Sequence, residues 1–458
     1  MNKELWTKIL DFKIDNPNDE YGFITRLAVE NNWTLFFTES AILEYKKFMY
    51  LAASYDEMVS PSEIVDVVWH QHLIFTVSYK QLSELLSKKI EHIPSTHNKA
   101  EKQKFEIAKS KTKELYETNF GEQPAEFWNF STNLDSLQMK QSKINSKYNK
   151  LIHLYSLIVI TVAVYYLLKP ILIQIESSEF LLYYPLLCIL SFLLLDYYIK
   201  VKFNTILDKI QSNIIIKNLT PFELIYFQKK HLAYIIHGVV NNLLANKKIK
   251  ILEDNKLTVI DESLTDNQYK NSVLNVMNDY KAIPYPLLIK ILIRKPIFEQ
   301  IQKSVDKIQE YINNSKKVQP TIMFAGIYII TLISIGVSRL ALGITRGKPI
   351  LFILLIMVCL IVFSLFYLKR ISNYFFTKSL PDFYQNEVLT NEQRQDWQWQ
   401  YFLMGSILLA PAFMSMTSSI NQRNSDYFGF GNSGGTSCGS SCGGGSSCGG
   451  GCGGCGGN

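Results

Sequence analysis

The chain has 458 residues, which is long enough for two or three domains, so a single hydrophobic core is not expected. Its net charge of +7 is modest for a membrane protein, whose cytoplasmic loops collect Lys and Arg, and therefore gives little support to nucleic-acid binding. The apolar fraction of 47% is ordinary, but the apolar residues gather in four or five blocks separated by polar intervals. No apolar run precedes a cleavage site near the N-terminus, so we expect no secretory signal peptide and insertion through internal segments.

Residues 1–130 form a polar block with Trp, Phe and Leu at spacings of three and four, which predicts a small all-α domain. Its best marked helix is expected to begin with Ser60 as the cap, Pro61 in the first position and Glu63 completing a capping box. Asp66 and His70, four residues apart, would then share one face of that helix, and His72 would point away from His70.

The same region contains an ordered set of residues that resembles a known family. The set reads Val65-Asp66-x-x-Trp69-His70-x-His72, then Tyr79, then His92-Ile93-Pro94, then Tyr116-x-x-x-Phe120-Gly121-x-x-Pro124-x-x-x-Trp128. Over roughly residues 20–130 it resembles the glycine-rich domain-containing protein family, which is known chiefly from plants and also occurs in bacteria. The resemblance implies a related fold and no particular reaction. Plant members continue with a second half and longer tails, whereas this chain turns to apolar segments.

Asp66, His70 and His92 are candidate ligands of a transition metal. The carboxylate would bind the ion directly or orient an imidazole from behind it. The alternative interpretation is structural: Trp69 packs in the core, His70 bonds Asp66 to fix the helical turn, and His92 marks a loop before Pro94. No zinc signature with two close ligand pairs is present, and no pattern of nucleophile, base and orienting group is recognisable, so we do not predict an enzyme.

The first pair of membrane spans is predicted within residues 151–200. Residues 151–168 and 180–195 contain no Asp, Glu, Lys or Arg, and each is just long enough to cross a bilayer as a helix. A basic linker at residues 131–150 precedes the pair. The basic residues Lys200, Lys202 and Lys209 follow the pair. The connection between the two spans is more acidic, because it contains Glu176 and Glu179 against a single lysine, Lys169. This asymmetry places the N-terminus and the following block in the cytoplasm.

Residues 203–319 are predicted to form a second helical domain. Thr220 and Glu223 flank the start of one helix, a second helix covers residues 231–246, and a strand-turn-strand follows at 248–260, which together suggest a winged-helix-like unit. Lys247, Lys248 and Lys250 beside the wing invite a nucleic-acid interpretation. The helix at 231–246 has almost no basic residues to meet phosphates, so a protein-contact module is favoured and nucleic acid is not expected as a partner.

A second pair of spans is predicted at residues 320–368, followed by a polar segment at 369–400. Residues 401–420 are uncharged but contain Pro411 and a Ser/Thr-rich end, so they either span the membrane or lie in the interface; we favour the interface. Four spans would leave the C-terminus in the cytoplasm, where thiols stay reduced.

Residues 424–458 form a Gly/Ser/Cys-rich tail that is expected to be disordered because it has no apolar content. Its cysteines could gather around Zn²⁺ or Cu⁺, and the Gly-Ser-Cys repeats also resemble the core of thiazole- and oxazole-forming microcin precursors; an unmodified flexible tail is the simplest interpretation. The five are Cys438, Cys442, Cys448, Cys452 and Cys455. With the paired spans, the tail resembles uncharacterised bacterial multi-pass membrane proteins with a Gly/Cys-rich C-terminus.

The sequence therefore predicts a mostly α-helical polytopic membrane protein with cytoplasmic helical domains and the lipid bilayer as its only defined partner. We expect a scaffold or interaction protein. The alternatives are a metal-dependent activity in the N-terminal domain and a membrane-tethered regulator.

Overall fold

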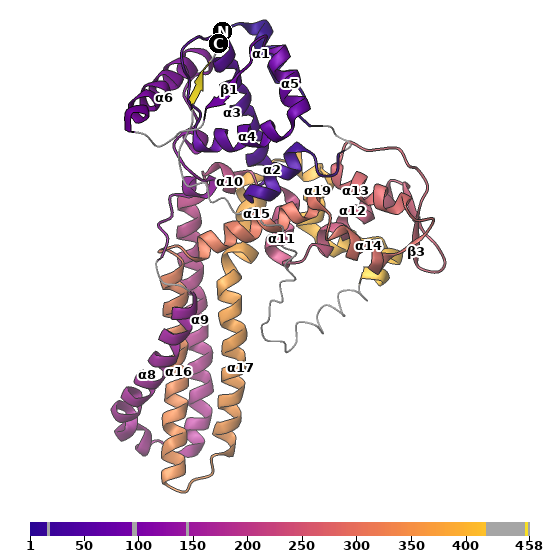
Figure 1. Ribbon diagram of the computed structural model, residues 1–458. Helices are drawn as coiled ribbons and strands as arrows, with labels where there is room; N and C mark the ends of the chain where they lie inside the picture. The colour runs from indigo at the N-terminus through magenta and orange to yellow at the C-terminus, as the bar shows by residue number, and fades with distance from the viewer. Residues whose placement is uncertain (16–18, 94–98, 143–145, 418–453, 457–458) are drawn as a thin grey trace. The chain divides into compact units, whose positions relative to one another are not determined.

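The computed structural model describes residues 1–15, 19–93, 99–142, 146–417 and 454–456 (Figure 1). It is mostly α-helical, which confirms the predicted fold class. The chain divides into two compact units, each built from separate stretches of sequence. The first unit comprises residues 1–136, 214–307 and 390–458, and the second comprises residues 137–213 and 308–389.

The N-terminal part of the first unit is a cluster of helices arranged around α3. Helix α3 contacts α1, α2, α4 and α6, and its Tyr45 and Phe48 are completely buried, as is Trp69 of α4. These large aromatic side chains supply most of the apolar surface that stabilises a small helical core. The elements are α1 (Lys3–Asp11), α2 (Phe23–Asn31), α3 (Leu35–Ser54), α4 (Glu63–Ile74), α5 (Thr76–Leu85), β1 (Glu91–Ile93), α6 (Lys99–Phe120), α7 (Ala125–Trp128) and the 3₁₀ turn η1 (Asn133–Leu137).

The start of α4 differs from the sequence prediction. Ser62, not Ser60, is the N-cap, and its hydroxyl accepts a hydrogen bond from the backbone N–H of Val65 at 3.2 Å. The backbone N–H of Ser60 instead donates to the hydroxyl of Thr112 on α6, at 2.7 Å. Both serines are residues of a type that caps helices, and Ser62 is the one that directly precedes Glu63, the first residue of α4.

The remainder of the first unit contains more helices and one small sheet. The helix predicted to begin after Thr220 is α11, and Thr220 and Glu223 form a capping box at its start. The predicted strand-turn-strand is the hairpin β2–β3. A third strand, β4, which was not predicted, pairs with β3 so that Leu257 lies opposite Ile283. The elements are α10 (Ile214–Lys217), α11 (Pro221–Lys229), α12 (Ala233–Ala245), β2 (Ile249–Ile251), β3 (Lys256–Val259), α13 (Gln268–Asn278), β4 (Ile283–Pro284), α14 (Tyr285–Leu292), α15 (Pro296–Asn313, which continues into the second unit), η4 (Gln393–Gln395), α19 (Trp397–Met404) and η5 (Gly405–Leu408).

The apolar segment after residue 400 is a bent helix pair. The pieces Trp397–Leu408 and Pro411–Thr417 meet at 80°, with the break just before Pro411. Tyr401 donates a hydrogen bond from its hydroxyl to the carbonyl of Tyr234 on α12, and Phe413 packs against Tyr285 on α14. The described part of this segment is therefore packed within the first unit, and proline causes the break because it lacks the N–H that a continuous helix needs.

The second unit contains four helices long and apolar enough to cross a membrane, which run side by side in Figure 1. Helix α16 contacts the other three. Each helix is longer than the predicted span because polar turns extend it at its ends. They are α8 (Ser146–Gln174), α9 (Ser177–Ile210), α16 (Gln319–Thr345) and α17 (Leu351–Tyr374), and η2 (Phe375–Ser379), α18 (Leu380–Phe383) and η3 (Tyr384–Val388) follow α17.

Close packing inside this unit depends on small and hydroxylated residues of α16. A Cβ atom added to Gly336 would clash with Met357 Sδ and Tyr184 Oη, so a larger residue there would force these two side chains to move. The Tyr184 hydroxyl donates to the carbonyl of Leu332 at 2.8 Å, and the hydroxyls of Thr161 and Ser334 lie 2.9 Å apart. Small residues and hydroxyl hydrogen bonds of this kind hold apolar helices together in lipid.

Candidate metal centre

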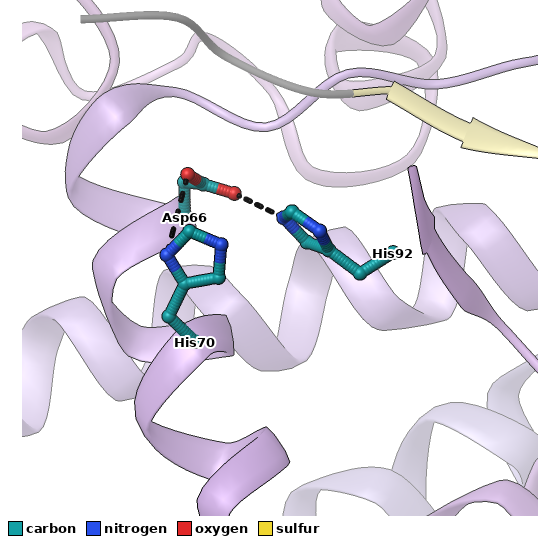
Figure 2. A group of neighbouring side chains, drawn as sticks. All are labelled: Asp66, His70 and His92. Carbon is teal, nitrogen blue, oxygen red and sulfur yellow. Dashed lines mark hydrogen bonds and ion pairs between the residues drawn. The ribbon is translucent and has the colours of Figure 1, made fainter. Parts of the chain in front are cut away.

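Asp66, His70 and His92 lie together in the first unit (Figure 2). One ligand atom from each residue can be chosen so that all of these atoms lie within 4.8 Å of one another. Asp66 and His70 come from successive turns of α4, and His92 comes from β1. His92 Nε2 lies 3.1 Å from Asp66 Oδ1, and His70 Nδ1 lies 3.8 Å from Asp66 Oδ2. The structure thus brings the three predicted residues together.

The cluster is partly open to solvent. The side chains of Asp66 and His92 are 15% and 13% exposed, whereas that of His70 is 55% exposed. The imidazoles of His70 and His92 are close neighbours, with ring centroids 4.4 Å apart. A carboxylate and two imidazoles that face one another beside solvent form a group that an ion can enter without a rearrangement of the core.

Aromatic residues of the core hold His92 in place. The indole of Trp69 lies 4.5 Å from the His92 ring, measured between centroids, and donates a hydrogen bond from Nε1 to the hydroxyl of Tyr79 at 3.2 Å. The Tyr79 hydroxyl in turn donates to the carbonyl of Ile90, at 2.5 Å, two residues before His92. This chain of contacts fixes β1 against α4, which explains why Trp69 and Tyr79 accompany the histidines in the sequence pattern.

His72 lies outside the cluster, as the helical spacing predicts. It is completely buried, and its Nδ1 and Nε2 are hydrogen-bonded to the hydroxyls of Tyr45 and Ser78 at 2.9 and 3.0 Å. Burial lowers the pKa of His72 to about 4, so the ring is neutral at pH 7. His72 is therefore a core residue with both ring nitrogens occupied.

The geometry of the cluster suits a small divalent ion. Zn²⁺ binds histidine nitrogen and carboxylate oxygen at about 2.0–2.2 Å, so ligand atoms around a tetrahedral ion lie roughly 3.3–3.5 Å apart. The separations of 3.1 Å to Asp66 Oδ1 and 3.8 Å to Asp66 Oδ2 lie on either side of that value, although they involve different oxygens of the carboxylate and the 3.1 Å contact is itself a hydrogen bond between His92 and Asp66. The limit of 4.8 Å for the whole set is wider, so an ion would draw the ligand atoms closer together. Two histidines and one carboxylate would also leave further coordination positions open. Alternatively, Asp66 is not itself a ligand and only orients the imidazole of His92, which binds the ion.

Four of the five predicted tail ligands, Cys438, Cys442, Cys448 and Cys452, lie outside the described residues. Cys455 belongs to the short strand β5 (Gly454–Gly456), which pairs antiparallel with β1. In this register the backbone of Cys455 lies opposite that of His92. The strand pairing therefore brings the C-terminal end of the tail to the strand that carries one of the candidate ligands.

A second polar cluster, centred on Glu44 of α3, was not predicted. Glu44 is buried, and its carboxylate accepts hydrogen bonds from Lys47, Tyr116 and Trp128, each at 2.7 Å. The donors Tyr116 and Trp128 belong to the resemblance pattern, but they lie 72 and 84 residues from Glu44 in the sequence. The sequence signal for this cluster was the position of Glu44 within the apolar residues of α3.

Lys248, one of the three lysines beside the hairpin β2–β3, is already ion-paired within the fold. Lys248 Nζ lies 2.8 Å from an Asp261 carboxylate oxygen and also donates to Ser263. Helix α12, which precedes the hairpin, is largely buried, with Ile235, Ile236 and Val239 completely inaccessible. A helix buried in this way cannot enter a DNA groove without unfolding its surroundings.

Comparisons with known proteins agree with the sequence resemblance over a limited part of the chain. A segment of 104 residues is 27% identical to glycine-rich domain-containing protein 2 of Arabidopsis thaliana, and covers 21% of this chain and 13% of the plant protein. A segment of 91 residues is 31% identical to glycine-rich domain-containing protein 1 of the same plant, and covers 19% of this chain and 11% of that protein. No family model and no solved structure matches the chain.

Proposed function

We propose that the chain is a multi-pass membrane protein whose N-terminal helical region, related to the plant glycine-rich domains, binds a divalent transition metal through Asp66, His70 and His92. One observation carries this proposal: three potential ligands converge within 4.8 Å, and two of them are mostly buried. The mixture of imidazole and carboxylate favours Zn²⁺ over Cu⁺, which prefers sulfur. We assign the protein a scaffold or interaction role, in which the metal fixes the surface formed by α4 and β1.

The test is metal binding by the purified full-length protein in detergent. We expect about one Zn²⁺ per chain by elemental analysis, retained through dialysis in the wild type and lost in the variants His70→Ala and His92→Ala. Asp56→Ala is the matched control, because Asp56 is an exposed carboxylate of the same region whose contact is a surface ion pair with Lys88. Equal zinc content in the wild type and the histidine variants would overturn the proposal. Metal-dependent turnover of any substrate would instead favour the enzymatic alternative.

The tail supplies a natural fourth ligand. The register that sets the backbone of Cys455 opposite His92 supports a thiolate from the tail as a ligand of the same ion. Cobalt substitution tests this, because a Co²⁺–thiolate bond gives an intense near-ultraviolet charge-transfer band. We expect the band in the wild type and in Cys359→Ser, whose cysteine lies on α17, and expect its loss in Cys455→Ser. A band that survives in Cys455→Ser removes Cys455 from the site and leaves the three-ligand centre standing.

The proposed orientation of the chain rests on the charges of the first hairpin, because the connection of the second pair of spans carries Arg339, Arg346 and Lys348 and the charge rule is indecisive there. Basic residues on both outer flanks of the first hairpin, against Glu176 and Glu179 in its connection, support a cytoplasmic N-terminus. A scan of single introduced cysteines in intact cells should find residues 1–150 and 203–319 shielded from an impermeant thiol reagent. Labelling of either range from outside would reverse this topology. The burial of α12 supports a role in protein contact over that of a membrane-tethered DNA-binding regulator.

A further inference from the structure

The second unit contains a cavity of 530 Å³ at one end of its four long helices. It lies where α8 and α16 end and where α9 and α17 begin. Its volume is within the range of roughly 300–1,000 Å³ that is usual for small-molecule sites. The cavity is separate from the candidate metal centre, because all of its lining residues belong to the second unit.

Positive charge dominates the lining. Arg339, Arg346 and Lys348 line the cavity together with one carboxylate, that of Glu176. None of these four side chains forms an ion pair with the residues that the structure describes. The lining therefore has a net charge of +2 from these groups, three cations less one anion, and it needs a counter-charge that the described chain does not supply.

The two arginines already have a structural task. The guanidinium of Arg339, which is 9% exposed, donates hydrogen bonds to the carbonyls of Leu172 and Ile175, and Arg346 donates to the carbonyl of Ile173 at 3.2 Å. These bonds satisfy carbonyls at the C-terminal end of α8. Each guanidinium has five N–H donors, so donors remain for a ligand. Lys348, in contrast, has no such bond among the described residues.

The backbone adds to the same electrostatic field. Helices α9 and α17 both begin at the cavity, and neither has a side-chain cap on its N-terminal N–H groups. Residues at both starts, Ser177 and Ile350, line the cavity. Uncapped N–H groups at helix N-termini attract anions, so they reinforce the cations.

We propose that this cavity binds the phosphate of an anionic phospholipid head group. The proposal rests on the proposed membrane insertion, which would set this end of the helices at the level of the head groups. Large apolar side chains stand exposed on α9, α16 and α17 close to the cavity in sequence, and offer a surface for acyl chains: Leu182, Ile344, Leu351 and Phe352. Basic pockets between membrane helices hold anionic head groups on the cytoplasmic side of membranes. With the orientation proposed above, the connections α8–α9 and α16–α17 that line this cavity lie on the opposite side, so the lipid would belong to the outer leaflet.

The experiment uses the full-length protein in neutral detergent. Phosphatidylglycerol, phosphatidylcholine or inorganic phosphate is added in separate samples. Bound lipid is counted by native mass spectrometry, and the unfolding temperature is measured in each sample. The variants are Lys348→Gln and the double variant Arg346→Gln with Lys348→Gln, which remove charge and keep a polar side chain. Lys169→Gln is the matched control, because Lys169 lies near the same end of α8 but does not line the cavity.

We expect phosphatidylglycerol to bind and to raise the unfolding temperature of the wild type and of Lys169→Gln. Affinity should fall roughly tenfold or more when a charge-assisted hydrogen bond is removed in the cavity variants. Glu176→Gln should bind phosphatidylglycerol more tightly, since it removes the one negative charge. The unfolding temperature without added lipid shows whether each variant is folded. Lys348→Gln should unfold at the wild-type temperature, because the Lys348 side chain makes no hydrogen bond or ion pair with the described residues.

Three results would overturn the proposal. Equal binding of phosphatidylglycerol and phosphatidylcholine would remove the anionic head group as the ligand. Saturable stabilisation by inorganic phosphate without any by phosphatidylglycerol would make the cavity a site for a free anion. Unchanged phosphatidylglycerol binding in Lys348→Gln and the double variant, with both variants folded, would place the lipid elsewhere. None of these results bears on membrane insertion, which carbonate extraction of membranes tests separately.

Discussion

Glu44 and Asp66 are both carboxylates on neighbouring helices of the same unit, yet their surroundings differ. Glu44 accepts hydrogen bonds from three donors of the chain and is almost inaccessible. Asp66 faces two imidazoles, one of which is more than half exposed. Glu44 is part of the core, because donors of the chain itself satisfy its carboxylate. Asp66 instead faces two imidazoles, which are common metal ligands, at the edge of solvent, where an ion has room to bind. The comparison separates a cluster whose partners all belong to the core from one that is a candidate metal site.

The largest effect is expected for Glu44→Gln. The change leaves Lys47, Tyr116 and Trp128 without their charged acceptor, and breaking a buried charged pair costs about 3–5 kcal/mol. The thermal midpoint of the full-length protein in detergent should fall sharply, and zinc content per folded chain should stay at the wild-type value. Asp56→Asn is the control and should leave the midpoint unchanged. A Glu44→Gln protein as stable as the control would show that Glu44 is not a structural centre.

His72 should make the first unit sensitive to acid. Burial lowers its pKa to about 4 in the fold from an ordinary 6.5, so the fold favours the neutral ring. Its contribution is fully present above pH 6.5 and is lost as the pH falls towards 4, with a magnitude of roughly 3 kcal/mol. As the pH falls from 7.5 to 4, the midpoint of His72→Gln should therefore rise relative to that of the wild type, because the variant lacks this loss of stability. A difference between the two midpoints that stays constant over this range would mean that the pKa of His72 is the same in the folded and the unfolded protein.

Glu223 should act in the opposite direction over nearly the same pH range. Burial raises its pKa to about 7, against the hydrogen bond that its carboxylate accepts from the Thr220 N–H at 2.7 Å. The fold favours the protonated form, so this stability is present below about pH 4.5 and is lost as the pH rises to about 7. Because His72 and Glu223 oppose each other, the wild type should show a shallow profile. Glu223→Gln should expose the acid sensitivity due to His72, and a profile identical to the wild type would contradict the assignment.

The smallest effect on stability is expected for Asp66→Asn. Asparagine keeps the size of Asp66 and one oxygen that can accept a hydrogen bond from His92, and His70 is exposed to solvent, so the free energy of unfolding of the metal-free protein should change by less than about 1 kcal/mol. Added Zn²⁺ should raise the midpoint of the wild type and raise that of Asp66→Asn much less, since loss even of a residue that only orients a ligand weakens metal binding by roughly 10–100-fold. Equal stabilisation of both proteins by zinc would place the ion away from Asp66.

Local features were predictable where the sequence itself contains both partners. The capping box of Thr220 and Glu223 spans three residues, and the four long apolar helices are recognised by length and composition, so both follow from the sequence. The predicted N-cap of α4 was wrong because Ser60 and Ser62 are both residues of a type that caps helices, and the helix begins two residues later than predicted, directly after Ser62. The Glu44 cluster was missed because its donors Tyr116 and Trp128 are distant from Glu44 in sequence.

The candidate site was partly predictable. The spacing of four residues sets Asp66 and His70 on one face of a helix, and that face is what the structure shows. The approach of His92 depends on β1, which is held by Trp69 and Tyr79 through contacts that no spacing rule describes. The cationic cavity of the second unit was not predicted at all, because its charges meet only when the ends of four helices come together.

X-ray absorption spectroscopy at the zinc edge of the zinc-loaded full-length protein tests the central proposal most directly. The Asp66–His70–His92 centre predicts two imidazole nitrogens and one carboxylate oxygen at about 2.0–2.2 Å, and a single sulfur at about 2.3 Å if Cys455 joins them. The imidazole signals should disappear in the double variant His70→Ala with His92→Ala. A shell made only of sulfur, with no imidazole, would show that the tail holds the metal by itself and would contradict the proposed centre.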